Sequence, residues 1–272
     1  MKSFDANYHC HTSRCGHAYG LDEEYVEAAI SSGFKVIGFT DHVILPGIHQ
    51  PGMRADENLL EDYFDSINAL KEKYKDQVEI HVGFECEWYG EVFENYYRDL
   101  LESGKCEYLI LGQHCDMPVF NQIHFYGSYP NQEAAIRAYA KDLIAGLRTG
   151  MFSYVCHPDM PVLWFGRFDA LMEQVSREIC LAAKKMNVPL EVNMGPTRFA
   201  HFDIDNPDVY LYPYPKFWDI AAEVGNDVII GVDAHHPDHY LSKLFGAFVE
   251  FCDKHHLHRL ERLTFRQKGK DF

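Results

Sequence analysis

Short apolar runs alternate with longer segments of helical periodicity along the whole chain. The apolar runs are typical of buried strands and lie at residues 4–10, 35–40, 78–84, 108–112, 152–156, 189–192 and 228–232. Between them, apolar residues recur with helical spacing, which predicts helices over residues 21–32, 57–75, 91–103, 131–148, 168–186, 216–224 and 242–255. Residues 116–129 contain aromatic residues and a glycine without helical periodicity, and they predict a loop or hairpin.

This alternation predicts a parallel sheet with helices packed outside it. About seven strand–helix units, with polar residues after the strands, favour an α/β fold of the TIM-like kind: a distorted, incomplete (β/α)7 barrel with its functional site at the C-terminal ends of the strands. An open doubly wound sheet is the alternative, but it would bring fewer strand ends together, and its G-x-G-x-x-G motif is missing. With no linker or repeat in the sequence, we expect residues 1–272 to form a single domain.

The charge balance narrows the range of partners. There are 41 acidic and 25 basic residues, a formal net charge of −16, and such a surface repels a nucleic-acid backbone. The sequence has no apolar run of the roughly 20 residues that span a bilayer, and the first residues lack a signal-peptide core. We therefore expect a cytoplasmic protein that binds neither nucleic acid nor membrane; no sequence feature indicates an oligomeric state.

Histidines and carboxylates follow the predicted strands closely. In chain order they are His9, His11, His17, His42, Glu85, His114, His157, Asp233 and His235. The His-x-His and Asp-x-His spacings place both side chains on one face of a strand. Any one of these residues alone would more often be a satisfied polar group, but imidazole and carboxylate at successive strand ends are the ligands of zinc, iron and manganese. The sequence therefore predicts a site for several metal ions and a hydrolytic reaction.

The motifs at these strand ends occur in the order of a known superfamily. They are His9-Cys10-His11 with His17, Gly38-Phe39-Thr40-Asp41-His42, Gly83-Phe84-Glu85, Gly112-Gln113-His114, Cys156-His157-Pro158, Glu191-Val192-Asn193 with Arg198, and Gly231-Val232-Asp233-Ala234-His235. On these residues the chain resembles the polymerase and histidinol phosphatase (PHP) superfamily, and within it the histidinol-phosphate phosphatases. The match spans nearly the whole chain. One departure is Asp41, where many relatives have Glu.

The resemblance implies a distorted seven-stranded barrel that holds two to three divalent metal ions, zinc, iron or manganese. It assigns His9, His11, Glu85 and Asp233 to the first ion, Glu85 as a bridge with His114 and His157 to the second, and His17, His42 and His235 to the third. In this set of nine ligands no position is missing.

The activity that the resemblance implies is hydrolysis of L-histidinol phosphate to L-histidinol and phosphate, a step of histidine biosynthesis, by attack of a metal-bridging hydroxide. Glu85, Asp233 and Arg198 would be the catalytic residues, with Arg198 binding the phosphoryl oxygens. His124 and His201 are candidates for further contacts with the small phosphorylated substrate. Another small phosphoester with the same metal core is the alternative.

Three other functions fit the sequence less well. Metal-dependent amidohydrolases also begin with His-x-His and end with Asp, but they usually place a bridging lysine at a middle strand end, where this chain has Glu85. A non-catalytic barrel would be expected to have lost ligands. A PHP exonuclease acting on DNA is disfavoured by the acidic charge and by the lack of a polymerase region.

Overall fold

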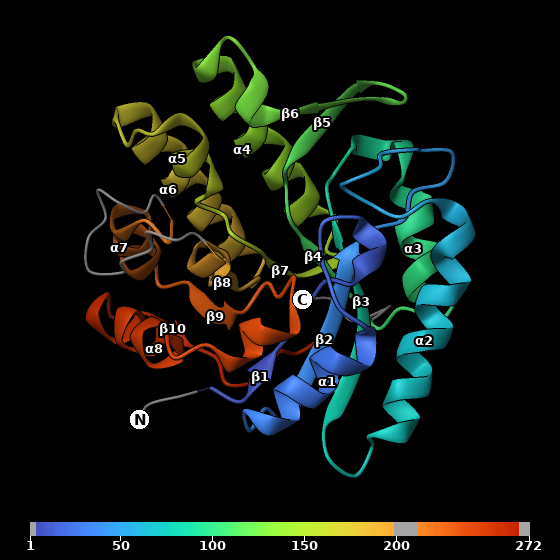
Figure 1. Cartoon of the computed structure of the whole chain (residues 1–272). Coiled ribbons are helices and arrows are strands. Elements are labelled where there is room, and N and C mark those ends of the chain that lie inside the picture. Colours follow the sequence, from blue (N-terminus) through green and yellow to red (C-terminus); the bar gives the residue numbers. More distant parts are fainter. Residues whose placement is uncertain (1–3, 199–211, 267–272) are drawn as a thin grey trace.

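The computed structural model describes residues 4–198 and 212–266 and shows a curled parallel sheet surrounded by helices (Figure 1). The strands pair in the order β1 (Ala6–Asn7), β2 (Val36–His42), β3 (Glu79–Cys86), β4 (Tyr108–Leu111), β7 (Phe152–Val155), β8 (Leu190–Asn193), β9 (Asp227–Gly231) and β10 (His258–Arg259). Every pair is parallel. The predicted TIM-like fold is confirmed, with one addition: the two-residue strand β10 is an eighth strand, too short to give a sequence pattern.

Two contacts bring the first and last parts of the sheet together. At the C-terminal ends of the strands, Cys10 forms a parallel bridge with Ala234, whose carbonyl accepts a hydrogen bond from the His11 amide at 2.8 Å. Just below, Asn7 Oδ1 accepts a hydrogen bond from the Val232 amide at 2.8 Å. At the opposite end, β10 pairs with the start of β9. The residues that follow β1 and β9 therefore lie side by side at one mouth of the barrel.

The helices follow the strands in sequence and cover the outside of the sheet (Figure 1). They are α1 (Asp22–Ser31), α2 (Leu60–Lys73), α3 (Glu94–Glu102), α4 (Gln132–Arg148), α5 (Met160–Phe165), α6 (Ala170–Lys185), α7 (Pro215–Val224) and α8 (Phe245–Lys254). Short 3-10 turns occur at η1 (Ser13–Cys15), η2 (Glu57–Leu59), η3 (Gly90–Val92), η4 (Tyr126–Ser128), η5 (Gly195–Arg198) and η6 (Pro237–Leu241). Within the described ranges, no helix combines the length and apolar composition needed to cross a bilayer.

The predicted helices bury the apolar stripes that identified them. In α2, Phe64, Ile67 and Leu70 are buried while the intervening polar residues face outward. Two N-termini are capped by side chains: Asn131 accepts a hydrogen bond from the Ala134 amide, and the cap of α6 is Asp169. Residues 116–129 contain the antiparallel hairpin of β5 (Cys115–Val119) and β6 (Gln122–Phe125), so one of the two predicted forms is confirmed.

Aromatic side chains fill the lower part of the barrel, toward the N-terminal ends of the strands. The hydroxyls of Tyr108 and Tyr154 both donate hydrogen bonds to the Tyr8 carbonyl, at 2.9 and 3.0 Å. Phe265, from the chain after β10, stacks on Tyr108 with ring centroids 4.4 Å apart. Gly38 makes room for this layer, since a Cβ there would lie 1.9 Å from the Tyr108 hydroxyl.

Candidate metal centre

The polar residues that follow the strands converge on a cavity of about 300 Å³ at the C-terminal mouth of the barrel. Its walls are formed by His11, His17, His42, Met53, Glu85, His114, His157, Met160, Arg198, Asp233 and His235. His9 lies beside it, fully buried, with its Nε2 3.2 Å from His11 Nε2. The structure thus brings together all nine residues that the sequence analysis assigned to metal ions.

Glu85, near the end of β3, is the centre of this group. Its Oε2 lies 3.2 Å from His42 Nδ1 and 3.4 Å from His11 Nε2. Its Oε1 lies 2.8 Å from His157 Nε2 and 3.6 Å from His114 Nε2. Burial raises the pKa of the Glu85 carboxyl, but the charges of His114 and His42 outweigh it and hold that pKa well below its usual range. A carboxylate whose two oxygens face different imidazoles can bridge two ions.

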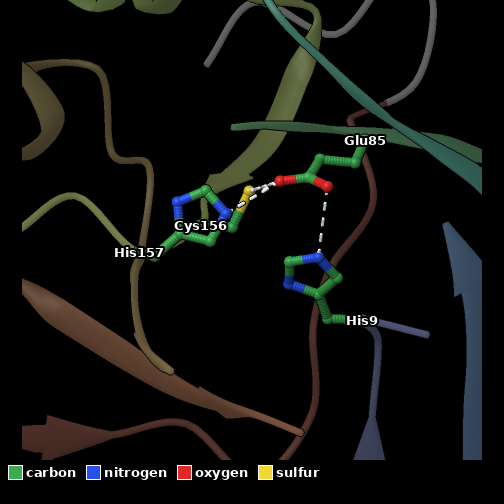
Figure 2. A group of neighbouring side chains, drawn as sticks. All are labelled: His9, Glu85, Cys156 and His157. Atoms are coloured by element: carbon green, nitrogen blue, oxygen red, sulfur yellow. Dashed lines mark hydrogen bonds and ion pairs between the residues drawn. The ribbon is translucent and has the colours of Figure 1, made fainter. Parts of the chain in front are cut away.

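Cys156 is a neighbour of Glu85 that the sequence analysis did not place in the site. Figure 2 shows Glu85 with His9 on one side and with Cys156 and His157 on the other. The Cys156 thiol donates a hydrogen bond to Glu85 Oε1 at 3.3 Å, and His9 Nε2 lies 3.5 Å from Oε2. Strand β7 ends at Val155, and His157 has a φ of +34°. The alternation of a regular strand therefore stops before Cys156, so both Cys156 and His157 face Glu85.

Asp233 and His235, just after β9, form the other side of the site. Asp233 Oδ1 lies 3.3 Å from His11 Nε2 and 3.3 Å from His235 Nδ1. His235 Nε2 lies 3.0 Å from His17 Nε2, so the two rings point at each other. Burial, together with the charge of His11, lowers the pKa of His235 to about 3. His235 is therefore a neutral imidazole at ordinary pH, which is the form that binds a metal ion.

The donor set fits divalent ions. Several buried atoms of this group make no hydrogen bond of acceptable geometry among the described residues: His11 Nδ1, His42 Nδ1, His157 Nδ1 and Asp233 Oδ1. Buried polar atoms normally have a partner. Ligand atoms lie within 4.8 Å of one another in the groups His9–His11–Asp233, His11–His42–His235, His42–Glu87–His114 and His9–Glu85–Cys156–His157. Imidazole and carboxylate in such groups are a zinc, iron or manganese donor set.

A second carboxylate, Glu191 in β8, holds His9 from behind. Glu191 Oε1 lies 2.9 Å from His9 Nδ1, and its Oε2 accepts hydrogen bonds from the His157 amide at 3.2 Å and from Asn193 Nδ2 at 2.7 Å. Gly231 leaves the necessary space, since a Cβ there would lie 1.7 Å from Glu191 Oε1. A carboxylate at one imidazole nitrogen orients the other toward the ion.

Glu87 does the same for His114, with Glu87 Oε1 3.3 Å from His114 Nδ1. Burial raises the pKa of the Glu87 carboxyl, but the charge of Arg54 outweighs it and lowers that pKa. The sequence analysis quoted Glu191 only as part of a motif and missed Glu87. Glu87 lies two residues after Glu85, and an extended strand would place both side chains on the same face. This spacing was the signal available in the sequence.

Arg198, at the end of η5, lies at the cavity wall. Its Nη1 donates to the Asp233 carbonyl at 2.8 Å and to His235 Nδ1 at 2.5 Å, and its Nη2 lies 3.3 Å from Asp233 Oδ2. The sequence analysis expected this residue to bind the phosphoryl oxygens of a substrate, and that contact stays a prediction. The guanidinium is thus a fixed cation at the edge of the site.

Of the two histidines expected to contact substrate, only one is among the described residues. His124 is exposed on β6, with its Nδ1 3.2 Å from the Tyr129 hydroxyl, and it is not one of the described residues that line the cavity. Its contact with substrate stays a prediction. His201 lies outside the described residues. Met53 and Met160 line the cavity instead, and no pattern in the sequence singled them out.

Comparisons with known proteins place the chain in a family. The "Probable histidinol-phosphatase" of Deinococcus radiodurans is 26% identical over 248 residues, which are 90% of this chain and 92% of that protein. The histidinol-phosphatase of Lactococcus lactis is 30% identical over 136 residues, 49% of this chain and 48% of that protein. A crystal structure of histidinol phosphate phosphatase from Lactococcus lactis, complexed with zinc, L-histidinol and phosphate, superposes with a TM-score of 0.72 at 20% identity, covering 96% of this chain and 98% of that one. The PHP-domain family model matches residues 7–195, and the chain therefore belongs to the PHP-domain family.

Proposed function

We propose that this protein is a metal-dependent phosphomonoesterase that hydrolyses L-histidinol phosphate to L-histidinol and phosphate. The observation that carries the proposal is the convergence of histidines and carboxylates around Glu85, with the Arg198 guanidinium beside them in one cavity. The substrate is supported by the relatives, which are named histidinol-phosphatases, and by the solved relative that holds L-histidinol and phosphate.

Two to three divalent ions, zinc, iron or manganese, are part of the proposal. The residues that would hold them are His9, His11, Glu85 and Asp233 at the first position, Glu85, His114 and His157 at the second, and His17, His42 and His235 at the third. When bound, such ions supply Lewis acidity and a water nucleophile at neutral pH.

The chain itself contributes orientation and charge. Glu85, Asp233 and Arg198 are the residues that we assign to catalysis. The contacts of Arg198 with Asp233 and His235 fix the guanidinium at the cavity wall. From there it can donate charge-assisted hydrogen bonds to phosphoryl oxygens and stabilise negative charge as it develops. Because the chain has a formal net charge of −16, this local cation offsets the repulsion of an anionic substrate.

The remaining wall of the cavity is suited to a small organic group. Met53 and Met160 line the same cavity as His157 and Arg198. Thioether side chains are flexible and adapt to planar groups, against which they make favourable contacts. A small phosphate ester can therefore place its phosphoryl group toward Arg198 and its organic part against the methionines.

The test is phosphate release from L-histidinol phosphate, beside a panel of other small phosphomonoesters and a nuclease substrate. The protein is assayed as purified, after chelation, and after reloading with manganese or zinc, with circular dichroism as the control for folding. We expect chelator-sensitive release that is fastest with L-histidinol phosphate. Metal-dependent release that favours another ester would overturn the substrate, and a folded, metal-loaded protein that releases no phosphate would overturn the activity.

A further inference from the structure

A buried ion pair lies directly behind the metal centre. Arg54 and Glu87 have fully buried side chains, and Arg54 Nη2 lies 2.9 Å from Glu87 Oε2. Arg54 also donates from Nε to Gln50 Oε1 at 2.8 Å, from Nη1 to the Val43 carbonyl at 2.9 Å, and from Nη2 to the Tyr89 hydroxyl at 3.3 Å. Burying two charges has a desolvation penalty that often cancels the attraction between them. Stability alone is therefore a weak reason for this pair.

The other oxygen of Glu87 points to the metal centre. Glu87 Oε1 lies 3.3 Å from His114 Nδ1, and His114 Nε2 lies 3.6 Å from Glu85 Oε1. The Glu87 carbonyl accepts a hydrogen bond from the Tyr97 hydroxyl at 2.8 Å, which fixes its backbone. In a neutral imidazole only one nitrogen carries a proton. With that proton on Nδ1, facing Glu87, the Nε2 lone pair of His114 faces Glu85 and the cavity.

We propose that Glu87 is a positioning residue: it fixes the tautomer and the ring orientation of His114, while Arg54 holds its second oxygen away from the ions. This inference rests on the proposed function, because it requires His114 to bind an ion. An oxygen of Glu87 comes within 4.8 Å of ligand atoms of both His42 and His114, so an unrestrained Glu87 could bind the ion itself. By holding one oxygen of Glu87, Arg54 keeps this carboxylate in the role of a positioning residue rather than that of a metal ligand.

The same contact joins the metal centre to the loop after β2. Met53 lines the cavity, and the next residue, Arg54, is buried against Glu87 and the Val43 carbonyl. The segment that forms one wall of the cavity is therefore fastened to the residue that orients a ligand. Glu87 thus acts on the reaction through His114 rather than by contact with substrate.

The first experiment measures the affinity of the Glu87→Gln variant for zinc by competition with a chromophoric chelator. We expect one ion per chain to bind about 10- to 100-fold more weakly, the loss typical of a removed partner behind a metal ligand. We also expect kcat to fall while KM for the phosphoester changes little. Wild-type zinc affinity in a folded Glu87→Gln variant would overturn the inference.

A double-mutant cycle with His114→Ala separates positioning from direct ligation. If Glu87 acts through His114, adding Glu87→Gln to His114→Ala has little further effect on zinc affinity. Additive losses would overturn the inference, because Glu87 would then bind the ion or act by its charge alone. Should Glu87→Gln unfold by leaving Arg54 unpaired, the whole cycle is repeated with Arg54→Met present in all four variants, and Arg54→Met alone replaces the wild type as the reference.

The matched control is Glu107→Gln, at the other end of the barrel. Glu107 also joins a histidine to a cation, with its Oε2 2.8 Å from His81 Nδ1 and its Oε1 2.6 Å from Lys71 Nζ. We expect zinc affinity to stay at the wild-type value in this variant. An equal loss in Glu107→Gln and Glu87→Gln would show a general effect on folding and overturn the inference. A wild-type protein that binds no zinc would overturn the proposed function as well, so the two failures are distinguishable.

Discussion

The two ends of strand β3 carry the same kinds of side chain in different arrangements. At the lower end, His81 Nδ1 lies 2.8 Å from Glu107 Oε2 and His81 Nε2 lies 3.1 Å from Glu79 Oε1, so both ring nitrogens have a carboxylate. At the upper end, His9 and His114 also have a carboxylate near each ring nitrogen. There, however, one carboxylate, Glu85, is shared by the rings of several histidines, and the buried Nδ1 of His157 has no hydrogen-bond partner among the described residues.

The difference shows what makes a histidine cluster a metal site. Histidine next to carboxylate at a strand end is common to both regions, and at His81 it forms a closed ion-pair network. At the upper end several imidazoles share one carboxylate, and ligand atoms in groups of three or four lie within 4.8 Å of one another. Buried polar atoms without partners are costly in a folded protein. Divalent ions bound at the upper end would remove that cost.

The largest expected effect is that of Glu85→Gln. This change removes the carboxylate that faces His42 and His157 from two sides, so we expect phosphate release to fall by more than about 10³-fold, beyond the loss from a single missing oxyanion donor. We also expect at least one ion per chain to be lost. Phosphate assays and elemental analysis of the dialysed protein measure both, and full ion content in this variant would contradict the role of Glu85.

Arg198→Ala comes next. Without the guanidinium beside Asp233, we expect kcat/KM to fall by about 10²- to 10³-fold, because a preorganised donor to the phosphoryl group is lost. The ion content should stay at the wild-type value. Arg198→Lys keeps the charge but not the planar fork, so its activity should lie between the two. Loss of ions from Arg198→Ala would show that Arg198 supports the metal centre rather than the substrate.

Glu191→Gln should have a smaller effect. The change weakens the hold on His9 Nδ1, now 2.9 Å from Glu191 Oε1, and we expect metal affinity to fall by about 10- to 100-fold. Titration with zinc in a chelator buffer measures it, with Glu107→Gln as the control. Equal losses of zinc affinity in Glu191→Gln and Glu107→Gln would contradict the difference between the two ends of the barrel.

The smallest effect is on stability, at the lower end. Burial raises the pKa of Glu107, but its hydrogen bonds with His81 and Lys71 outweigh this and lower the pKa to about 2. A depressed carboxyl pKa stabilises the folded state above about pH 4.5, and the stabilisation disappears as pH falls toward 2. We expect Glu107→Gln to cost roughly 1 kcal/mol at pH 7, since the group is partly exposed. Urea unfolding measured from pH 7 down toward pH 2 should show that the loss of unfolding free energy in Glu107→Gln disappears in acid. A loss that is independent of pH would contradict the lowered pKa of Glu107.

The sequence predicted most of the fold because each strand is a short apolar run and each long helix has a continuous apolar stripe. Strand β10 and helix α5 were missed because two and six residues give no period. Strand β1 is only Ala6–Asn7, shorter than the apolar run that predicted it. Beyond β1, Cys10 still forms a parallel bridge with Ala234 between His9 and His11.

The sequence also predicted which residues would meet, because parallel strands bring their C-terminal ends to one face. It did not predict the partners behind the ligands. Arg54 reaches Glu87 from a loop 33 positions away, and that distance in sequence carries no periodic signal. The predicted strand 152–156 runs one residue beyond the end of β7, and on a regular strand Cys156 and His157 would face opposite sides.

One measurement tests the central claim most directly: crystals of the zinc-loaded protein soaked with phosphate, with anomalous data collected at the zinc absorption edge. The account predicts anomalous peaks on both sides of Glu85 and phosphate in contact with Arg198, and none beside His81 and Glu107. A zinc-loaded crystal that shows no anomalous peak at Glu85, or shows zinc at His81 instead, would contradict the account.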